Sequence, residues 1–538
     1  MHCRASTTAR WLLLAASIAW LAACAAESQD SASAPDRDAG AAARALGPDL
    51  ERFIAEASIL ELQAAMAAGR LSAETLTAYF LAQIAERNPE LGAVIAVNPG
   101  ALAAARALDA ERARGALRGP LHGIPILVKD NIETRELPTT AGSLALASNR
   151  TGRDAPVVAR VRAAGAIVLG KANLSEWANF RSERSSSGWS AVGGQGRNPH
   201  DTTRSPCGSS SGSGIAVAAG LAVAALGTET DGSVVCPSSV NGVVGIRPSM
   251  GFVSRTGIVP ISHTQDSAGP MARSVADAAI LLAAMAGPDP QDPVTEQAGA
   301  LFELGDAGAL GAAGLRARRI GVLRSAVGYR EGVERLLRRA IAALQASGAV
   351  IVDGLELTPY DTFYDDSYEV LLYEFKHDLD AYLAGLPNDS NQLTLEELIR
   401  FNEEHAAAEL AYFGQDIFLK AQAKGPLTEE AYTGALARIR QATRSDGIDR
   451  LLREHRLDAL IAPTYDPAWV IDLVNGDHWG VDGFSTYPAV AGYPHVTLPM
   501  GKVHGLPVGL SFTGAAFSDR ALLELAAAFE RLGVGRAD

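Results

Sequence analysis

The chain has 538 residues, of which 48% are hydrophobic, and it carries a formal net charge of −14. This length and composition are those of a globular protein with a large core. The negative charge argues against a nucleic-acid partner, which requires a basic surface, and the sequence contains no polybasic patch that would attract a membrane surface.

The first 50 residues are predicted to be a targeting segment followed by a tether. A short basic region precedes an apolar stretch over 11–21, which is too short to span a bilayer. The motif Leu-Ala-Ala-Cys that ends at Cys24 resembles a bacterial lipobox, so residues 1–23 are predicted to be a lipoprotein signal peptide and Cys24 the lipidated residue. The alternative is an ordinary signal peptide with an unmodified cysteine. Residues 24–50 are rich in Ala, Asp and Ser and are predicted to be a disordered tether.

These features predict an exported protein that is lipid-anchored in the bacterial cell envelope, at the outer membrane or in the periplasm. The residue after Cys24 is Ala rather than Asp, which favours the outer membrane in a Gram-negative host. The anchor would be the only contact with a membrane. An exported protein could pair Cys207 with Cys236, but free buried thiols fit the sequence equally well.

From residue 51 onward, predicted helices and strands alternate along the chain. Helix–glycine–strand units recur at 154–170 and 333–352. We therefore expect an α/β fold: a single large domain over 51–538, with a central mixed, largely parallel twisted sheet covered by helices on both faces. Further helices are predicted over 58–68, 72–88, 101–114, 274–286, 368–383, 394–419, 429–453 and 519–532, and further strands over 126–128, 319–323, 457–462, 496–499 and 508–512. Residues 177–204 are predicted to be a loop, and the helical block over 368–453 is expected to wall a substrate cleft.

The stretch from Cys207 to Ser239 has the composition of a site rather than of a core. The Gly/Ser cluster CGSSSGSG is followed by an apolar run over 215–226 and then by the turn Thr-Asp-Gly-Ser that ends at Ser233. Glycine lets the backbone approach a ligand closely, and serine supplies a hydroxyl that can attack a substrate or relay a proton. Both turns are therefore expected to belong to one site.

Several other chemistries lack their motifs. The ten histidines are scattered, and no HExxH, CxxC, P-loop or dinucleotide-binding motif occurs, so neither a metal nor a cofactor is expected. The cluster matches GxSxG, but the segment before it is polar and contains two prolines, whereas a nucleophile elbow follows a strand. No lysine has a serine three residues before it, as a Ser-x-x-Lys motif requires. What remains is a serine nucleophile whose lysine base is remote in sequence.

Lys129 stands at an unusual place for a lysine. It ends the apolar segment Ile-Leu-Val at 126–128, which is predicted to be a buried strand. Taken alone, it fits better as a strand-end lysine that reaches water along its own stem. A buried ammonium group is costly unless it is paired or neutral.

Three motifs occur in the order and at the spacings of the amidase signature family. They are ILVKDNI around Lys129, the cluster CGSSSGSG, and GTETDGSVVCP, in which Ser233 lies 24 residues after Ser209. The flanking segments PLHGIP, GRNPHDTTRSP, AGYPHVTLPMG and GLPVGLSFTG fit as well. From about Ser58 to its C-terminus, the sequence therefore resembles this family.

The resemblance implies a serine hydrolase that cleaves carboxamides through a Ser–Ser–Lys triad and an acyl-enzyme. Ser233 would be the nucleophile, Lys129 the base, and Ser209 the proton relay, held after a cis peptide bond with Gly208. Ser210 would be a supporting hydroxyl behind the triad. A neutral lysine can act as a base only if its pKa is lowered, which burial at a strand end achieves.

The same resemblance assigns the oxyanion hole to backbone N–H groups of the second turn, those of Thr230, Asp231, Gly232 and Ser233. The small residues of this turn fit that role because the N–H groups must face the substrate. One such donor lowers the barrier by roughly 2.7–4 kcal/mol.

The sequence departs from the commoner pattern of the family at both turns. Where the family usually has GGSSGG, this sequence has CGSSSG. Where the family usually has Gly-Gly-Ser-Ile-Arg, residues 231–235 are Asp-Gly-Ser-Val-Val, and Glu229 stands where Asp is usual. Because the usual Arg is absent, the sequence leaves its structural ion pair in doubt. These departures, with LLYEFK, RFNEEH and YFGQD in the helical block, are similar to the bacterial peptide amidases.

That similarity implies release of ammonia from the C-terminal amide of peptides, and the expected partner is a small-molecule or short peptide amide. The alternatives are an amidase for other aliphatic, aryl or fatty amides, a glutamyl-tRNA amidotransferase-like subunit, or a non-catalytic binding lipoprotein on the same scaffold. The chain is expected to be a monomer or a homodimer.

Overall fold

The computed structural model describes residues 47–298, 305–324, 330–478 and 483–536. The predicted signal peptide, Cys24 and most of the predicted tether lie outside the described residues. The first described helix begins at Pro48, so the last residues assigned to the tether, 48–50, are helical. In the described part of the chain, no helix has the length and apolar character needed to cross a membrane.

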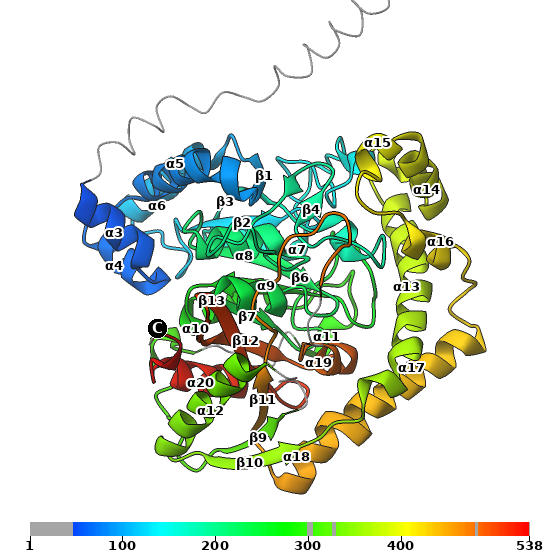
Figure 1. Cartoon of the computed structure of the whole chain (residues 1–538). Helices are drawn as coiled ribbons and strands as arrows, with labels where there is room; N and C mark the ends of the chain where they lie inside the picture. Colours follow the sequence, from blue (N-terminus) through cyan, green and yellow to red (C-terminus); the bar gives the residue numbers. More distant parts are fainter. Residues whose placement is uncertain (1–46, 299–304, 325–329, 479–482, 537–538) are drawn as a thin grey trace, which may run out of the picture.

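The strands form one large mixed sheet that runs through the middle of the molecule (Figure 1). In chain order they are β1 (Val94–Val97), β2 (Pro125–Lys129), β3 (Ile167–Ala172), β6 (Ala224–Glu229), β7 (Val244–Arg247), β8 (Ser267–Ala272), β9 (Arg319–Leu323), β10 (Val350–Leu355), β11 (Ala459–Pro463), β12 (His495–Val503) and β13 (Leu506–Thr513). The 11 strands lie in the order β1-β3-β2-β6-β8-β7-β12-β13-β11-β9-β10. Parallel pairs form two groups, β3–β2–β6 and β11–β9–β10, and antiparallel strands join them.

Helices surround this sheet. They are α3 (Pro48–Glu56), α4 (Ile59–Ala67), α5 (Ala73–Leu91), α6 (Ala101–Ala113), α7 (Pro156–Ala163), α8 (Ser211–Ala218), α9 (Val235–Asn241), α10 (Val275–Met285), α11 (Thr295–Ala298), α12 (Glu331–Ala346), α13 (Tyr364–Ala384), α14 (Leu395–Glu404), α15 (Ala406–Glu409), α16 (Asp416–Gln422), α17 (Glu430–Thr443), α18 (Asp449–His455), α19 (Thr486–Ala491) and α20 (Asp519–Glu530). The helical block α13–α17 forms a wall along one side of the molecule (Figure 1).

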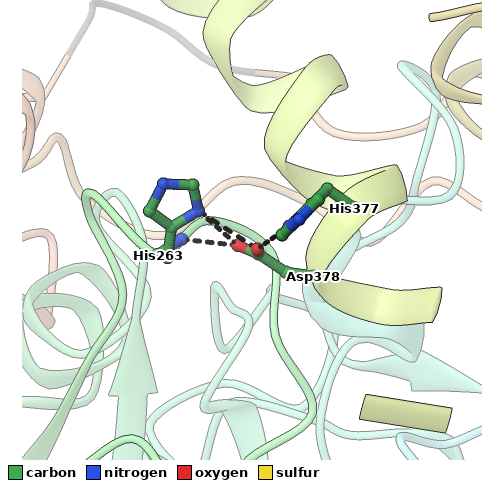
Figure 2. A group of neighbouring side chains, drawn as sticks. All are labelled: His263, His377 and Asp378. Carbon is green, nitrogen blue, oxygen red and sulfur yellow. Dashed lines mark hydrogen bonds and ion pairs between the residues drawn. The ribbon is translucent and has the colours of Figure 1, made fainter. Parts of the chain in front are cut away.

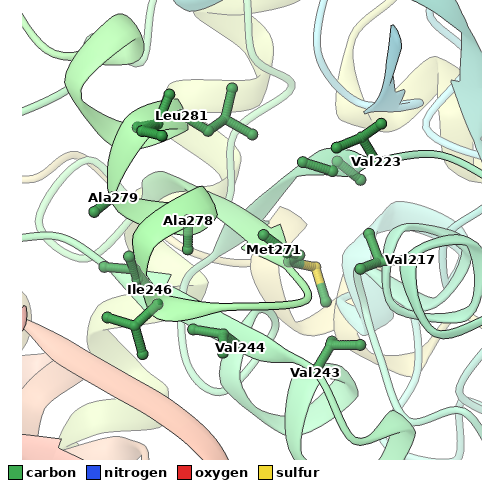
Figure 3. Close-up of a cluster of buried hydrophobic side chains, with 14 of the residues drawn as sticks. Val217, Val223, Val243, Val244, Ile246, Met271, Ala278, Ala279 and Leu281 are labelled. Carbon is green, nitrogen blue, oxygen red and sulfur yellow. The ribbon is translucent and has the colours of Figure 1, made fainter. Parts of the chain in front are cut away.

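The central strands are buried along their whole length. Every residue of β2, β3, β6 and β8 is buried, so the side chains on both faces of the sheet are covered. Figure 3 shows part of the core that joins the layers, with Val217 of α8, Val244 and Ile246 of β7, Met271 of β8 and Ala278 of α10. The predicted α/β class, the mixed sheet and its cover of helices are confirmed.

The helical block is more broken than the periodicity predicted. The expected continuous helix over 394–419 is three helices, α14, α15 and α16. The break is held by tertiary contacts, because the buried carboxylate of Glu409 accepts hydrogen bonds from Ser143 Oγ at 3.0 Å and from the Leu144 N–H at 2.7 Å. The expected helix over 429–453 is interrupted by a π-helical turn, Arg444–Ile448.

Two other boundaries differ from the prediction. Helix α5 was expected to stop before Pro89, but it continues to Leu91 and ends at Gly92, whose φ is 61°. Pro89 has no N–H to donate to the carbonyl four residues earlier and its ring crowds that carbonyl, and the helix ends two residues later at Leu91. The predicted loop over 177–204 contains the short hairpin β4 (Trp189–Ser190) and β5 (Gly194–Gln195).

Candidate active site

The two serine turns meet at the ends of β2 and β6. The Gly/Ser cluster leads into α8, and the second turn connects β6 to α9. Ser210 joins the turns, because its N–H donates to the carbonyl of Ser233 at 3.1 Å. Its hydroxyl also fastens the cluster to β6, donating to the Thr228 carbonyl at 3.0 Å and accepting from the Thr228 N–H at 3.1 Å.

Lys129 ends β2 and points into this junction rather than to water. Its side chain is fully buried, and its Nζ lies 2.8 Å from Ser209 Oγ. The same Nζ donates to Thr228 Oγ1 at 2.8 Å and lies 3.3 Å from the Thr228 carbonyl. None of the described carboxylates forms an ion pair with it. The interpretation of Lys129 as a lysine that reaches solvent is therefore wrong.

Burial without an ion pair lowers the pKa of Lys129 to about 7. Its amine can therefore be neutral near neutral pH and can accept a proton from the hydroxyl of Ser209. The arrangement couples a buried base to a buried hydroxyl, since Ser209 is also fully buried.

A pH-rate profile tests this state of Lys129. We expect kcat/KM on a neutral amide to rise about tenfold per pH unit below pH 7 and to reach a plateau above it, because only the unprotonated amine can act as a base. Initial rates over a range of buffers at constant ionic strength measure this profile. A rate that does not change across pH 7 would contradict it.

Ser233 is the member of this group that reaches the surface. It retains 8% exposure, whereas Ser209 and Lys129 are fully buried. Its hydroxyl makes no hydrogen bond to another residue in the described part of the chain. Ser233 is therefore the residue of this group that a substrate can contact, whereas the Lys129–Ser209 pair is buried behind the surface.

Gly208 allows the close packing of the first turn. The Gly208–Ser209 peptide bond is cis, as the resemblance implied. A Cβ at Gly208 would lie 2.1 Å from Ser175 Oγ. The carbonyl of Ser209 also accepts a hydrogen bond from the Ser175 N–H at 3.1 Å. Any larger residue at 208 would push the cluster away from Lys129.

The second turn presents backbone N–H groups beside Ser233. Among the described residues, the N–H groups of Thr230, Gly232 and Ser233 have no acceptor. Gly232 has a φ of 76°, and a Cβ there would lie 2.4 Å from the hydroxyl of Tyr465. The fourth predicted member, Asp231, is fixed through its carboxylate, which accepts hydrogen bonds from Ser485 and Thr486.

The ion pair that the sequence placed in doubt is present with a different arginine. Glu229 at the end of β6 is fully buried and accepts hydrogen bonds from the N–H groups of Val234 at 2.7 Å and Val235 at 2.9 Å. Its other oxygen lies 3.5 Å from Nε of Arg247, at the end of β7. Arg247, 18 residues after Glu229, therefore supplies the charge that the usual arginine at position 235 would provide. The structure thus resolves the doubt that the sequence left about this ion pair.

A disulfide joins the two turns. Cys207, next to Gly208, is bonded to Cys236 in the first turn of α9, which resolves the choice that the sequence left open. Both sulfurs lie in a small buried cluster with Val240 and Ala468. The bond thus fixes the start of the Gly/Ser cluster relative to the helix that follows Ser233.

Removal of this bond should destabilise the protein. For a sequence separation of 29 residues, the double variant Cys207→Ser/Cys236→Ser should lose about 3–4 kcal/mol of unfolding free energy. Chemical denaturation with and without dithiothreitol measures the loss. The reductant should lower the stability of the wild type and leave the variant unchanged; an equal effect on both would contradict the assignment.

Two cavities are lined by residues of the second turn or by residues that face it. One, of about 390 Å³, is lined by Thr228 and Thr230 on the side of the site and by α13 on the other, including Ala381 and Tyr382. The other, of about 540 Å³, includes Tyr465, the residue whose hydroxyl faces Gly232. The expectation that the helical block walls a cleft beside the site is confirmed for α13.

Thr228 is the main site residue that the sequence did not single out. Its Oγ1 accepts hydrogen bonds from Lys129 at 2.8 Å and from Asn131 Nδ2 at 2.9 Å. It therefore orients the amine toward Ser209. The available signal was its place in the motif GTETDGS, two residues before the predicted oxyanion turn.

Comparison with known proteins identifies the fold and the family. The family model described as Amidase matches residues 75–523. The chain belongs to the amidase signature family. Its structure superposes on the peptide amidase of Stenotrophomonas maltophilia with a TM-score of 0.84 and 48% identity, covering 90% of this chain and 97% of that one.

Curated sequences of the amidase family are similar over almost the same length. A probable amidase of Arabidopsis thaliana is 41% identical over 488 residues, which cover 89% of this chain and 90% of the relative. One chain of the glutamyl-tRNA(Gln) amidotransferase of Symbiobacterium thermophilum is 35% identical over 486 residues, covering 86% of this chain and 94% of that one. The predicted resemblance is confirmed, and the protein is an amide-cleaving hydrolase.

Proposed function

We propose that this amidase releases ammonia from the C-terminal carboxamide of peptides, with Ser233 as nucleophile, Ser209 as proton relay and Lys129 as base. The observation that carries the chemistry is the 2.8 Å contact between Lys129 Nζ and Ser209 Oγ in a fully buried setting. The 48% identity to a peptide amidase over 90% of the chain supports the choice of substrate.

The proposed first step forms an acyl-enzyme. Ser233 Oγ attacks the carbonyl carbon of the amide while its proton passes to Ser209 Oγ, whose own proton passes to the neutral amine of Lys129. The negative charge that develops on the carbonyl oxygen is stabilised by N–H groups of the turn over 230–233. These donors are fixed before the substrate arrives, because Glu229 and the Asp231 carboxylate anchor both ends of the turn.

The relay then runs in reverse. The Lys129 ammonium returns its proton through Ser209 to the leaving nitrogen, and ammonia departs as the tetrahedral intermediate collapses. Water next attacks the ester on Ser233, with the same relay removing its proton, and the acid product is released. A hydroxyl suits the middle position because it donates and accepts at once.

The cavity beside the site supports a peptide-sized substrate. Its volume of about 390 Å³ lies within the roughly 300–1,000 Å³ typical of ligand pockets. The segment over 258–261, Ile-Val-Pro-Ile, gives it an apolar wall, and Arg255, Asp292 and Asp378 place charges around it. This mixture suits the alternating apolar and polar groups of a short peptide.

Ammonia release from four amides tests the substrate class. The panel is a blocked dipeptide amide, an aryl amide, a fatty amide and free glutamine. The proposal expects the highest kcat/KM on the peptide amide, with one acid product and no internal cleavage. The same dipeptide with a free C-terminal carboxylate is the matched control and should release no ammonia. Activity confined to glutamine would instead favour the amidotransferase-like function and contradict the proposal.

We also propose that the protein is exported and anchored by a lipid on Cys24. The basis is the lipobox-like motif before this cysteine. Labelling of the expressing bacterium with radioactive palmitate should mark the wild type and not the Cys24→Ser variant. A wild type that takes up no label would contradict the anchor.

A further inference from the structure

Two histidines that lie far apart in the sequence both contact the carboxylate of Asp378, which lines the cavity of about 390 Å³ beside the candidate site. His263 belongs to the segment between β7 and β8, and His377 and Asp378 are consecutive on α13 (Figure 2). In the described part of the chain, their potential ligand atoms all lie within 4.8 Å of one another. His263 and Asp378 line the cavity that also touches Thr228 and Thr230.

We propose that His263, His377 and Asp378 bind a transition-metal ion of the Zn²⁺ class. Two imidazole nitrogens and one carboxylate oxygen are a ligand set that suits Zn²⁺, Co²⁺, Ni²⁺ or Cu²⁺ better than Mg²⁺ or Ca²⁺. Three protein ligands leave one tetrahedral position for water. No metal was expected from the sequence because the histidines are scattered along it. The fold brings His263 close to His377 and Asp378, which the sequence alone does not show.

The distances require only small movements of the side chains. Nδ1 of His263 lies 2.9 Å from Asp378 Oδ2, and Nδ1 of His377 lies 2.9 Å from Asp378 Oδ1. Zinc bonds of 2.0–2.1 Å place tetrahedral ligand atoms about 3.3 Å apart. A metal ion would therefore replace the imidazole protons that these nitrogens share with the carboxylate.

The second ring nitrogen of His263, Nε2, lies near a carboxylate that can accept its proton when Nδ1 binds a metal. Once Nδ1 binds a metal, the ring proton must reside on Nε2, and a ligand histidine usually donates that proton to a carboxylate, a backbone carbonyl or water. Nε2 of His263 lies 3.5 Å from Oε1 of the buried Glu374. The hydroxyl of Tyr432 donates to the same carboxylate at 2.7 Å and holds it in place. Both histidines are exposed, at 40% and 60% of the side chain, so an ion can reach them.

The ion would connect the segment that supports the oxyanion turn to the helical block. Asp266, three residues after His263, binds the hydroxyl of Thr230 and accepts hydrogen bonds from the N–H groups of Ile261 and Ser262. His377 and Asp378 belong to α13 instead. A metal shared by the two elements would restrict their separation, so its binding should raise thermal stability.

Titration of the full chain, purified without a metal-affinity tag and treated with a chelator, tests the site. Calorimetry should show one Zn²⁺ bound per chain, Co²⁺ should give the visible absorption of a tetrahedral complex, and Zn²⁺ should raise the thermal midpoint while Mg²⁺ does not. His263→Ala and His377→Ala should each weaken binding at least about tenfold. Because His377 is exposed and outside the catalytic group, its variant should keep the metal-free amidase rate.

His478→Ala is the matched control. The side chain of His478 is as exposed as that of His377, and its Nε2 lies 3.1 Å from Oδ2 of Asp472. Among the described residues, no second histidine joins this pair to form a metal-binding group. This variant should bind Zn²⁺ like the wild type. The proposal is overturned if the wild type binds no Zn²⁺ at micromolar concentration, or if His377→Ala binds it as tightly as the wild type.

Discussion

Replacing Ser233 with alanine should lower kcat on a peptide amide by about a millionfold, the scale seen when a serine hydrolase loses its nucleophile. The variant loses one accessible oxygen that makes no hydrogen bond within the described chain, so its stability should stay close to that of the wild type. Ammonia release measures the rate, and a fluorophosphonate probe should label the wild type alone. Comparable turnover in both proteins would exclude Ser233 as the nucleophile.

A neighbouring serine provides the control for this change. Ser238 lies on α9, five residues after Ser233, and its buried hydroxyl has no hydrogen-bond partner among the described residues. Ser238→Ala removes the same kind of atom from the helix that follows the turn, without changing the turn or the Lys129–Ser209 pair. We expect its activity within about twofold of the wild type, since this hydroxyl is fully buried in α9, has no hydrogen-bond partner among the described residues and is out of reach of a substrate.

The residues that meet at the candidate site could be singled out from the sequence because they lie in short motifs at fixed spacings. Lys129 ends the buried strand β2, Ser209 lies in the Gly/Ser cluster, and Ser233 follows the buried strand β6. The small residues indicate where the backbone must pack closely, as at Gly208 and Gly232. Local sequence does not report partners that come from other strands. Thr228 is reached from Lys129 only because β2 and β6 are adjacent in the sheet.

The same reason explains the two features that the sequence left open or missed at the turns. Whether Cys207 meets Cys236 depends on how α9 packs on the cluster, which a linear spacing does not determine. The absence of the usual arginine left its ion pair in doubt, and Arg247 reaches Glu229 from β7. A buried carboxylate needs a partner, and the sheet supplies one from a different strand.

Helix boundaries in the block over 368–453 were the least predictable part of the fold. Hydrophobic periodicity continues through the breaks after α14 and at Gly447, so it predicts longer helices than the chain forms. The break near Glu409 is fixed by contacts with Ser143 and Leu144, which lie more than 250 residues earlier. Tertiary contacts of this kind override a local pattern.

Two buried lysines at the ends of neighbouring strands give the sharpest test of the proposed base. Lys129 ends β2 and lacks an ion-pair partner among the described carboxylates. Lys171 in β3 is equally buried, but its Nζ lies 3.2 Å from Asp130 and donates to the carbonyl of Ile132 at 2.6 Å. Burial lowers the pKa of both amines, yet only Lys129 contacts a site serine.

Lys129→Met should therefore reduce kcat by about 10²–10⁴-fold, the contribution of a general base, and abolish the rise in rate near pH 7. Its loss of unfolding free energy should stay within about 1–3 kcal/mol, because the methionine leaves hydrogen bonds of Ser209 and Thr228 unmade but no buried carboxylate without its cation. Lys171→Met should instead cost about 3–5 kcal/mol of unfolding free energy, since it leaves Asp130 buried without its cation. At temperatures where the Lys171 variant remains folded, it should retain most of its turnover. Denaturation curves and pH-rate profiles of both variants separate the two roles, and a stable, active Lys129→Met enzyme would show that the base lies elsewhere.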